Sequence, residues 1–368
     1  MSIKNQKKGF NTPRQGRISV AVLCGGPSLE RGISLNSARS VLDHLGSQGV
    51  DIVPIYFNEH KKAYKISTAQ LYSNTPSDFD FKLSNKSMLS ESALVRILKN
   101  AAIVFPCMHG SFGEDGEIQA FLEKHNIFFI GSSSKSCKMA FDKHKANEYI
   151  RSLGFYAPNS IVLKITDTKK EILNKVNKFW KDEKLTRAIV KPASGGSSIG
   201  VFSVENINDA INSIEHLFSK RMDTRVVVES FAKGKEFTLI ILQNRFNMPI
   251  ALIPSEIEMY YANNQFFDFR KKYLPTNQVK YHCPPSFSNE IIEKIQIEAE
   301  QLFSVFGMRD FARFDGFLLP DGNIWFSDFN PIPGMEQNSF LFQQSSRVGF
   351  SHQDLFRFLV NNACLRRE

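Results

Sequence analysis

The stretch RDFARFDGFLLPDGNIWFSDFNPIPGMEQNS, residues 309–339, has the clearest local pattern in this 368-residue sequence. It contains two apolar runs rich in aromatic residues, Phe311 to Leu319 and Ile324 to Phe329. The segment between them, Pro320-Asp321-Gly322-Asn323, is typical of hairpin turns. The sequence therefore predicts two antiparallel strands here, with a Pro-Gly turn after them.

Four polar residues lie within this hairpin. The first strand contains Arg313 and Asp315, and the second contains Asp328 and Asn330. We expect Asp315 and Asn330 to face each other. Two carboxylates and an amide oxygen are hard ligands, which suit Mg2+ carrying nucleotide phosphates. The alternative is that the acidic residues form only the solvated face of the hairpin. Their place inside apolar runs favours a metal site, because a buried carboxylate without a cation is destabilising.

The composition is that of a globular protein with more than one core. Hydrophobic residues make up 42% and charged residues 23% of a chain whose length predicts two or three domains. No apolar run approaches the roughly 18 residues of a membrane helix. The first 17 residues are polar and basic, without the apolar middle of a signal peptide. We therefore expect a flexible basic tail at residues 1–17 and a cytoplasmic protein without membrane contact.

The cysteines and the net charge narrow the functional classes. The five cysteines are widely spaced and form no CxxC pair, which predicts free thiols in a reducing compartment and no structural zinc. The formal net charge of +9 is compatible with nucleic-acid binding, but the sequence contains no recognisable nucleic-acid motif. Anionic nucleotide substrates account for the charge equally well, so we expect no nucleic-acid partner.

The N-terminal part of the chain has the pattern of a doubly wound unit. A buried strand, Ile18 to Cys24, leads through Gly25-Gly26 into a helix from Leu29 to about Leu45. Another buried strand, Ala101 to Pro106, runs into HGSFGEDGEIQAFLE. Ligands bind at the carboxyl ends of parallel strands, where four polar residues are expected to converge: Ser28, Glu30, His109 and Glu114. No full GxGxxG is present, so nicotinamide binding is not favoured.

The middle of the chain contains a candidate phosphate site. After a short strand expected at Phe128 to Ile130 and a helix expected from Ser134 to about Leu153, residues 188–201 read AIVKPASGGSSIGV. Lys191 lies on a predicted strand before the glycine-serine loop. Backbone N–H groups of such a loop can hold phosphate oxygens, and the lysine adds a positive charge. The alternative is an ordinary Gly-Ser hairpin loop. Lys191 and the following proline favour the phosphate site.

The last part of the chain adds a nucleotide grip and a lid. Glu229 and Glu236 lie at the edges of two predicted strands, where they are suited to accept hydrogen bonds from an adenine amino group and from ribose hydroxyls. The segment from about 255 to 285 has no sustained hydrophobic periodicity of a helix or a strand. Its centre, FFDFRKKYLP, mixes aromatic and basic residues. Long loops in compact domains are usually functional or disordered. We expect this one to close over an anionic substrate.

The order and spacing of these motifs resemble the D-alanine:D-alanine ligases of the ATP-grasp superfamily over residues 18–364. The motifs that carry the resemblance are GGPSLERGISLNSA, HGSFGEDGEIQ, MAFDKHK, VKPASGGSSIG, GKEFTL, KKYLP, ARFDG and DFNPIPGM. The resemblance implies an α/β and α+β protein, in which a Rossmann-like domain at 18–132 precedes a two-lobed ATP-grasp fold at 133–228 and 229–368. It also implies a ligase that joins two D-alanines with ATP for peptidoglycan precursor synthesis in cell wall biogenesis.

The resemblance assigns nucleotide and metal contacts residue by residue. The matching residues are Lys143, Lys191 and Lys272 at the phosphates, Glu229 at adenine, Glu236 at ribose, and Asp315, Asp328 and Asn330 at two Mg2+ ions, which Mn2+ can replace. The metals and lysines would disperse charge while the γ-phosphoryl group passes to a carboxylate and forms an acyl phosphate. A lid excludes water while that intermediate exists.

The resemblance also assigns the amino acid contacts. The matching residues are Glu30 with nearby His109 at the first ammonium group, Ser197 and Tyr273 as partners that orient Glu30 and close the lid, Arg313 and the N–H of Gly334 at the oxyanion, and Ser339 at the second carboxylate. Homodimerisation through the N-terminal domain is a further implication.

Several positions depart from the family's usual residues. Asp328 replaces a glutamate among the metal ligands, and Pro331 and Phe340 stand at positions usually held by threonine and by leucine or methionine. Phe267 and Phe269 replace tyrosines of the lid. These changes leave two alternatives to the D-alanine:D-alanine ligase open. One is a ligase for a different amino acid pair, and the other is a nucleotide-binding homologue that has lost turnover.

Overall fold

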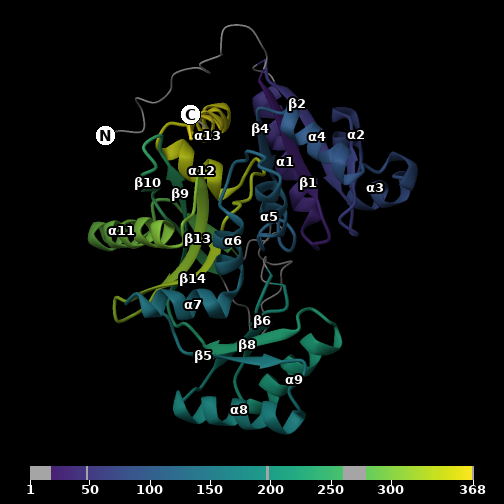
Figure 1. Cartoon of the computed structure of the whole chain (residues 1–368). Helices are drawn as coiled ribbons and strands as arrows, with labels where there is room; N and C mark the ends of the chain where they lie inside the picture. The colour runs from purple at the N-terminus through teal and green to yellow at the C-terminus, as the bar shows by residue number, and fades with distance from the viewer. Residues whose placement is uncertain (1–17, 47–48, 196–198, 260–278, 367–368) are drawn as a thin grey trace.

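The computed structural model describes residues 18–46, 49–195, 199–259 and 279–366. These residues build three β-sheets, each with helices packed on it (Figure 1). The order along the chain is an N-terminal, mostly parallel sheet, then a small antiparallel sheet, then a larger antiparallel sheet. No helix in the described part of the chain combines the length and apolar character needed to cross a bilayer.

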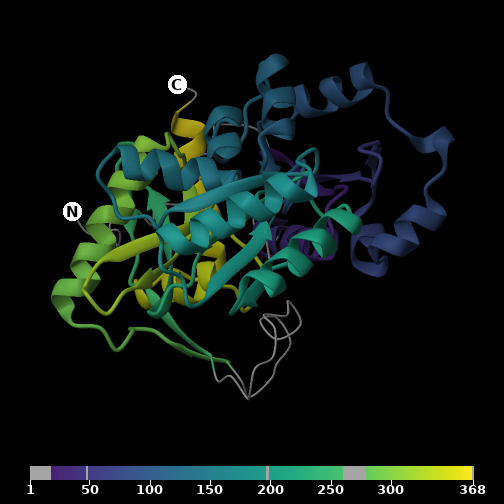
Figure 2. The same cartoon turned by 90° about the horizontal axis from the view of Figure 1, so that it is seen from below.

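The N-terminal sheet has the strand order β3-β2-β1-β4, with β1 parallel to β2 and β4. Its elements are β1 (Ser19–Gly25), α1 (Arg31–Leu45), β2 (Asp51–Phe57), β3 (Ala63–Lys65), α2 (Thr68–Ser73), α3 (Pro76–Lys82), a 3-10 turn (Asn85–Ser87), α4 (Glu91–Asn100), β4 (Ile103–Pro106) and α5 (Glu117–Lys124). Alternate residues of β1 pack on opposite faces, since Val20 and Val22 join the core with α1, whereas Ala21 and Leu23 join the core with α4 and α5. In Figures 1 and 2, α2 and α3 lie at the outer edge of this sheet. The expected doubly wound start is therefore present.

Two expectations for the segment that follows differ from the structure. The expected strand at Phe128 to Ile130 is reduced to a single bridge between Val104 and Phe129. The helix expected from Ser134 to Leu153 is divided into α6 (Ser134–Phe141) and α7 (Lys143–Ser152). Asp142 separates them, because its carboxylate accepts the Lys145 N–H at 3.1 Å as the N-cap of α7. Arg225 holds that carboxylate from the other side at 2.8 Å.

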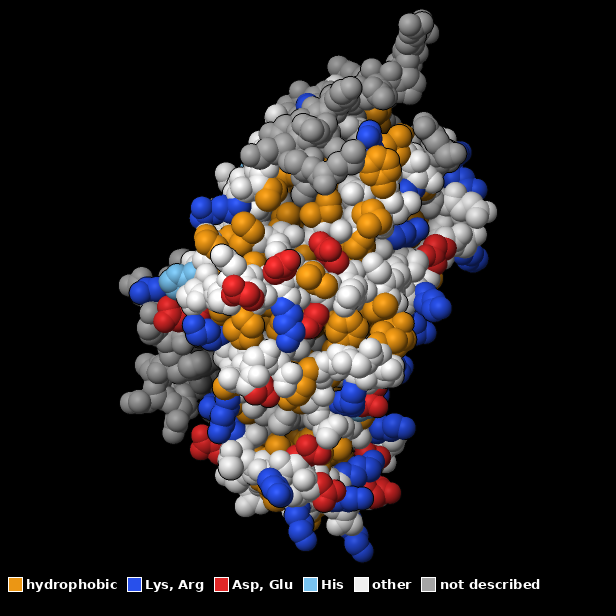
Figure 3. All heavy atoms as spheres, turned by 90° about the vertical axis from the view of Figure 1, so that its left-hand side faces the viewer, with side chains coloured by type: hydrophobic (Ala, Val, Ile, Leu, Met, Phe, Trp, Pro, Cys, Tyr) orange, Lys and Arg blue, Asp and Glu red, His pale blue; other side chains and the backbone are white. Residues whose placement is uncertain are grey.

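The small antiparallel sheet has the order β5-β8-β6-β7. Its elements are β5 (Ser160–Lys164), α8 (Lys169–Asp182), β6 (Ala188–Pro192), β7 (Phe202–Val204), α9 (Ile207–Ser219) and β8 (Arg225–Ser230). The helices α8 and α9 pack on one face of the sheet and share an apolar core with it. This unit forms the lower end of the molecule in Figure 1 and lies nearest the viewer in Figure 2. Acidic and basic side chains are interspersed over the side of this end that Figure 3 shows.

The larger sheet has the order β12-β11-β9-β13-β14, with β10 paired to β9. Its elements are β9 (Lys235–Gln243), β10 (Pro249–Ala251), β11 (Ser255–Met259), β12 (Val279–His282), α11 (Asn289–Val305), β13 (Phe311–Leu318), β14 (Ile324–Asn330), α12 (Phe340–Arg347) and α13 (His352–Leu365). One face packs on α11, and the other shares a core with α12, α13 and the N-terminal sheet. The expected lid at 255–285 is partly sheet, since β11 pairs with β12. Residues 260–278 lie outside the described part.

Candidate active site

The hairpin β13–β14 forms as expected, but the expected register is wrong. Asp315 lies opposite Asp328, and Asn330 lies opposite Arg313. The turn closes through the Leu319 N–H, which donates to the Asn323 carbonyl at 2.9 Å. That turn alone would pair Asp315 with Ser327, but a bulge between Asp315 and Gly316 shifts the pairing by one residue. The two carboxylates therefore face each other directly.

Cationic and polar groups surround these carboxylates. Arg313 donates through two nitrogens to Asp315, each at 3.0 Å, and Thr238 donates to the same carboxylate at 2.6 Å. Lys143 at the start of α7 pairs with Asp328 at 2.9 Å. Asn330 donates to Asp315 at 3.2 Å, so its amide lies beside the carboxylate pair. These contacts place positive charge and hydrogen-bond donors directly around the two carboxylates.

The donor set fits a divalent cation. Asp315, Asp328 and Asn330 supply hard oxygen atoms from neighbouring strands, which is the chemistry of magnesium sites. Among the described residues, no cluster of three or more His, Cys, Asp or Glu side chains competes as a metal site. The set predicted from the sequence reaches three donors only by including the Asn330 amide, and its role as a metal site stays a prediction.

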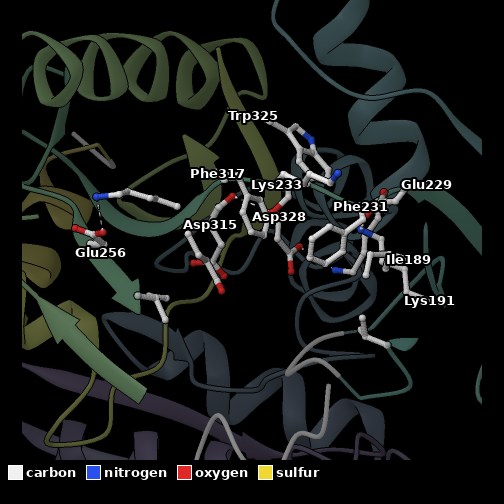
Figure 4. A pocket seen from close by; sticks show the side chains of 18 of the residues that line it. Ile189, Lys191, Glu229, Phe231, Lys233, Glu256, Asp315, Phe317, Trp325 and Asp328 are labelled. Carbon is white, nitrogen blue, oxygen red and sulfur yellow. Dashed lines mark hydrogen bonds and ion pairs between the residues drawn. The ribbon is translucent and has the colours of Figure 1, made fainter. Parts of the chain in front are cut away.

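Asp315 and Asp328 open into a cavity of about 980 Å³ between the two antiparallel sheets (Figure 4). The apolar part of its wall includes Ile189, Ile199, Val201, Phe231, Phe317 and Trp325. The charged part includes Lys143, Lys191, Glu229 and Glu236, each predicted as a nucleotide contact, together with Glu256 and Lys235. A cavity of this size with apolar walls and a few fixed polar groups is typical of a cofactor-sized ligand.

Lys191 and Glu229 form a buried ion pair that the sequence did not predict. Lys191 lies on β6 and Glu229 on the adjacent strand β8, and their side chains are 9% and 2% exposed. The Lys191 ammonium also lies 5.9 Å from the centre of the Trp325 ring. The second carboxylate oxygen of Glu229 is buried without a hydrogen-bond partner among the described residues. That oxygen is suited to accept a hydrogen bond from a bound ligand.

A second polar cluster lies at the carboxyl ends of β1 and β4, where the sequence placed it. Ser28, Glu30, His109 and Glu114 are all buried there. The Gly110 N–H donates to Glu114 at 2.7 Å, and a Cβ added at Gly110 would lie 2.7 Å from the Glu30 carboxylate. Gly110 also has a positive φ of +72°. The turn after β4 therefore needs glycine both for its conformation and for the space beside Glu30.

Burial shifts the pKa values of two groups in this cluster. Burial, and then the nearby Glu30 charge, raise the pKa of Glu114 to about 8. Burial, and then the Arg313 charge, lower the pKa of His109 to about 4. His109 Nε2 lies 3.0 Å from the Ser37 hydroxyl on α1. At neutral pH the imidazole is therefore uncharged.

The segment after β14 brings the predicted Gly334 and Ser339 to the same region. The Met335 N–H donates to the Ser37 hydroxyl at 3.2 Å, which fixes the turn against α1. Ser339 is the N-cap of α12, and its buried hydroxyl has no hydrogen-bond partner among the described residues. The structure therefore brings together every predicted site residue that it describes, in one cavity and its adjoining cluster. Ser197, Lys272 and Tyr273 lie outside the described residues.

One residue at this site was missed by the sequence analysis. Glu336 lies two residues after Gly334, and a Cβ added at Gly334 would be 2.6 Å from its carboxylate. The only signal in the sequence was its place directly after the Pro-Gly turn. The side chain bends back over that turn, which local sequence patterns do not determine.

Comparisons with known proteins identify the family. The family model for the N-terminal domain of D-Ala-D-Ala ligases matches residues 19–132, and the model for the C-terminal domain matches residues 150–361. The chain belongs to the D-alanine–D-alanine ligase family. The Streptococcus uberis D-alanine–D-alanine ligase is 30% identical over 356 residues, covering 94% of this chain and 95% of the relative. The ligase of Paenarthrobacter aurescens is 26% identical and covers 97% of this chain and 98% of its own length.

Solved structures of ligases share the fold. The D-alanine–D-alanine ligase of Coxiella burnetii aligns with a TM-score of 0.77 and 23% identity, over 95% of this chain and 96% of that chain. A D-Ala:D-Ser ligase from Enterococcus faecalis aligns with a TM-score of 0.77 and 24% identity, over 95% of this chain and all of that chain. The ATP-grasp fold expected from the motifs is thereby confirmed. Members of this ligase family use ATP and a divalent metal.

Proposed function

We propose that this protein joins two D-alanines with ATP into D-alanyl-D-alanine, for peptidoglycan precursor synthesis in the cytoplasm. The observation that carries the proposal is the facing pair Asp315 and Asp328, which lies at the junction of the large cavity and the buried cluster around Glu30. Arg313 joins the two regions, since it holds Asp315 and its charge acts on His109. A nucleotide phosphate and an amino acid carboxylate can thus meet at this junction.

The cavity residues would bind the nucleotide. The free oxygen of Glu229 would accept a hydrogen bond from the adenine amino group, and Glu236 would bind the ribose hydroxyls. Lys143 and Lys191 would contact the phosphates and, with two Mg2+ or Mn2+ ions held by Asp315, Asp328 and Asn330, neutralise their charge. Lys191 would leave Glu229 partly for the phosphate, and Lys272 would add a further positive charge.

The buried cluster would bind the first D-alanine. Glu30 would receive its ammonium group, with His109 uncharged nearby, so that the carboxylate points toward the phosphates. That carboxylate attacks the γ-phosphorus and forms an acyl phosphate, which makes the acyl carbon reactive because phosphate is a good leaving group. Ser197 and Tyr273 would orient Glu30 and complete the lid at about 255–285.

The second half of the reaction would take place beside Gly334. The amine of the second D-alanine attacks the acyl carbon, and Arg313 with the Gly334 N–H would stabilise the oxyanion. The Ser339 hydroxyl, which lacks a partner among the described residues, would bind the second carboxylate at the positive end of α12. We place the three domains at 18–132, 133–228 and 229–368, and infer a homodimer through the first of them.

The test is phosphate release by the purified protein with ATP and Mg2+, with mass detection of the product. D-Alanine is compared with L-alanine, D-serine and D-lactate, and Asp315→Asn serves as the inactive control. D-Alanine-dependent phosphate release together with the dipeptide supports the proposal. Bound ATP without turnover on any substrate would favour a homologue that has lost activity.

A second candidate is a ligase that uses another amino acid in the second position. Phe340, the first residue of α12, packs edge-on against Tyr281 of β12 with ring centres 5.0 Å apart. Phe340 directly follows Ser339, so this ring pair would restrict the side chain of the second substrate. Mixed incubations of D-alanine with D-serine or larger D-amino acids distinguish the candidates by the mass of the product.

A further inference from the structure

Glu336 is a carboxyl group at the acyl-transfer site that neither the nucleotide grip nor the site of the first amino acid uses. Its carboxylate lies over Gly334, where an added Cβ would approach it to 2.6 Å. The backbone around it is fixed, because the Met335 N–H donates to Ser37 and the Ser339 N–H donates to the Glu336 carbonyl at 2.8 Å. The backbone that carries the Glu336 side chain is therefore fixed between the expected oxyanion site and the start of α12.

The surroundings of Glu336 suit a proton acceptor. Burial raises its pKa, its own backbone N–H and the Arg313 charge lower it, and the Glu30 charge raises it, with a net shift above the usual value for glutamate. A carboxylate with a raised pKa is a stronger base than one in water. Arg313 on β13 and Glu30 before α1 are the charged groups that act on it from the neighbouring elements.

The second substrate presents a proton that must be removed. An amino acid at neutral pH carries mainly an ammonium group, whose nitrogen has no electron pair for attack. We place its carboxylate at Ser339, the N-cap of α12. The proposed reaction then requires its ammonium group to point toward Gly334 and the acyl carbon. Glu336 lies three residues before Ser339, on the same turn.

We propose that Glu336 binds the ammonium group of the second amino acid and takes its proton before attack. The nitrogen then forms the C–N bond to the acyl carbon, and the C–O bond to phosphate breaks with its electron pair on the phosphate oxygen. The phosphate takes the second nitrogen proton as it leaves, and Glu336 releases the first to water. This inference rests on the proposed acyl-phosphate reaction and adds a catalytic residue to it.

Hydroxylamine separates the two halves of the reaction. It is uncharged at neutral pH and attacks an acyl phosphate without a base, giving a hydroxamate. For Glu336→Gln at pH 7 we expect dipeptide formation to fall by about 100-fold or more, with hydroxamate formation within about threefold of wild type. The dipeptide rate should recover as pH rises, because more of the second amino acid is then neutral. Glu336→Asp, which keeps the carboxylate, should retain part of the dipeptide rate.

A matched control is Glu298→Gln on α11. Burial also raises the pKa of Glu298, but that helix packs on β9 and β10, away from the Gly334 turn. Glu298→Gln should therefore leave the rates of dipeptide and hydroxamate formation unchanged. A parallel loss of dipeptide and hydroxamate in Glu336→Gln would show a structural role and overturn the inference, as would dipeptide formation at the wild-type rate. A wild-type protein that gives neither product would instead contradict the proposed function itself.

Discussion

At the residue scale, the proposed role of Lys191 at the phosphates gives a direct test of the proposal. Lys191 is buried beside Glu229 and over Trp325, so its charge acts in surroundings that screen it little. Lys191→Ala should lower turnover by about 100-fold or more, as loss of a charge-stabilising donor does. It also leaves Glu229 buried without its cation, so thermal unfolding is measured alongside. Lys181→Ala on α8 is the control, and wild-type turnover by Lys191→Ala would contradict the assignment.

Also at the residue scale, Glu114 predicts a pH dependence of stability. Its pKa is raised from 4.5 to about 8, so the folded state binds more protons than the unfolded state between those values. The free energy of unfolding therefore falls as pH rises through this window. The pKa of His109 is lowered from 6.5 to about 4, so its contribution to the free energy of unfolding rises with pH. That opposite effect is confined to pH values below 6.5. From pH 6.5 to 8, urea unfolding of Glu114→Gln should show a smaller loss of stability than wild type, whereas Glu205→Gln should match wild type. Equal slopes for all three would contradict the shift.

At the element scale, the turn after β4 positions Glu30. Gly110→Ala places a methyl group against the Ser28 hydroxyl and 2.7 Å from the Glu30 carboxylate. Gly49→Ala is a matched control, because its φ of +75° is close to the +72° of Gly110 but its Cβ would have nothing within 4 Å. Both should lose about 1–2 kcal/mol of stability from the positive φ. Only Gly110→Ala should raise KM for the first D-alanine. A similar KM for both variants would contradict this role of the turn.

Sequence patterns predicted the helices and strands well, but they predicted the contacts between distant parts of the chain less well. The β13–β14 hairpin follows from its apolar runs and turn, which are local. The expected pairing of Asp315 with Asn330 was wrong by two residues, because the register depends on where the turn closes and on a bulge that leaves Ser327 of β14 without a partner position, and no local pattern marks either. The break at Asp142 depends partly on Arg225 of β8, 83 residues away. The Lys191–Glu229 pair exists because β6 and β8 are neighbours, which is a property of the sheet order.

At the scale of the whole molecule, the cavity between the two antiparallel sheets should close on the nucleotide. Trp325 lines this cavity, and the only other tryptophan of the chain is Trp180 on α8. In Trp180→Phe, ATP with Mg2+ should change the fluorescence of Trp325 in a saturable way. In Trp325→Phe, the remaining Trp180 should respond little. A response confined to Trp180 would place the nucleotide elsewhere.

The most direct test of the acyl-phosphate reaction uses D-alanine labelled with 18O in its carboxylate. The carboxylate oxygen that attacks the γ-phosphorus stays with phosphate when the second amine displaces it. The account predicts that each phosphate released with dipeptide carries one labelled oxygen, and that Asp315→Asn releases none. Dipeptide accompanied by unlabelled phosphate would contradict it, because the carboxylate would then never have been phosphorylated.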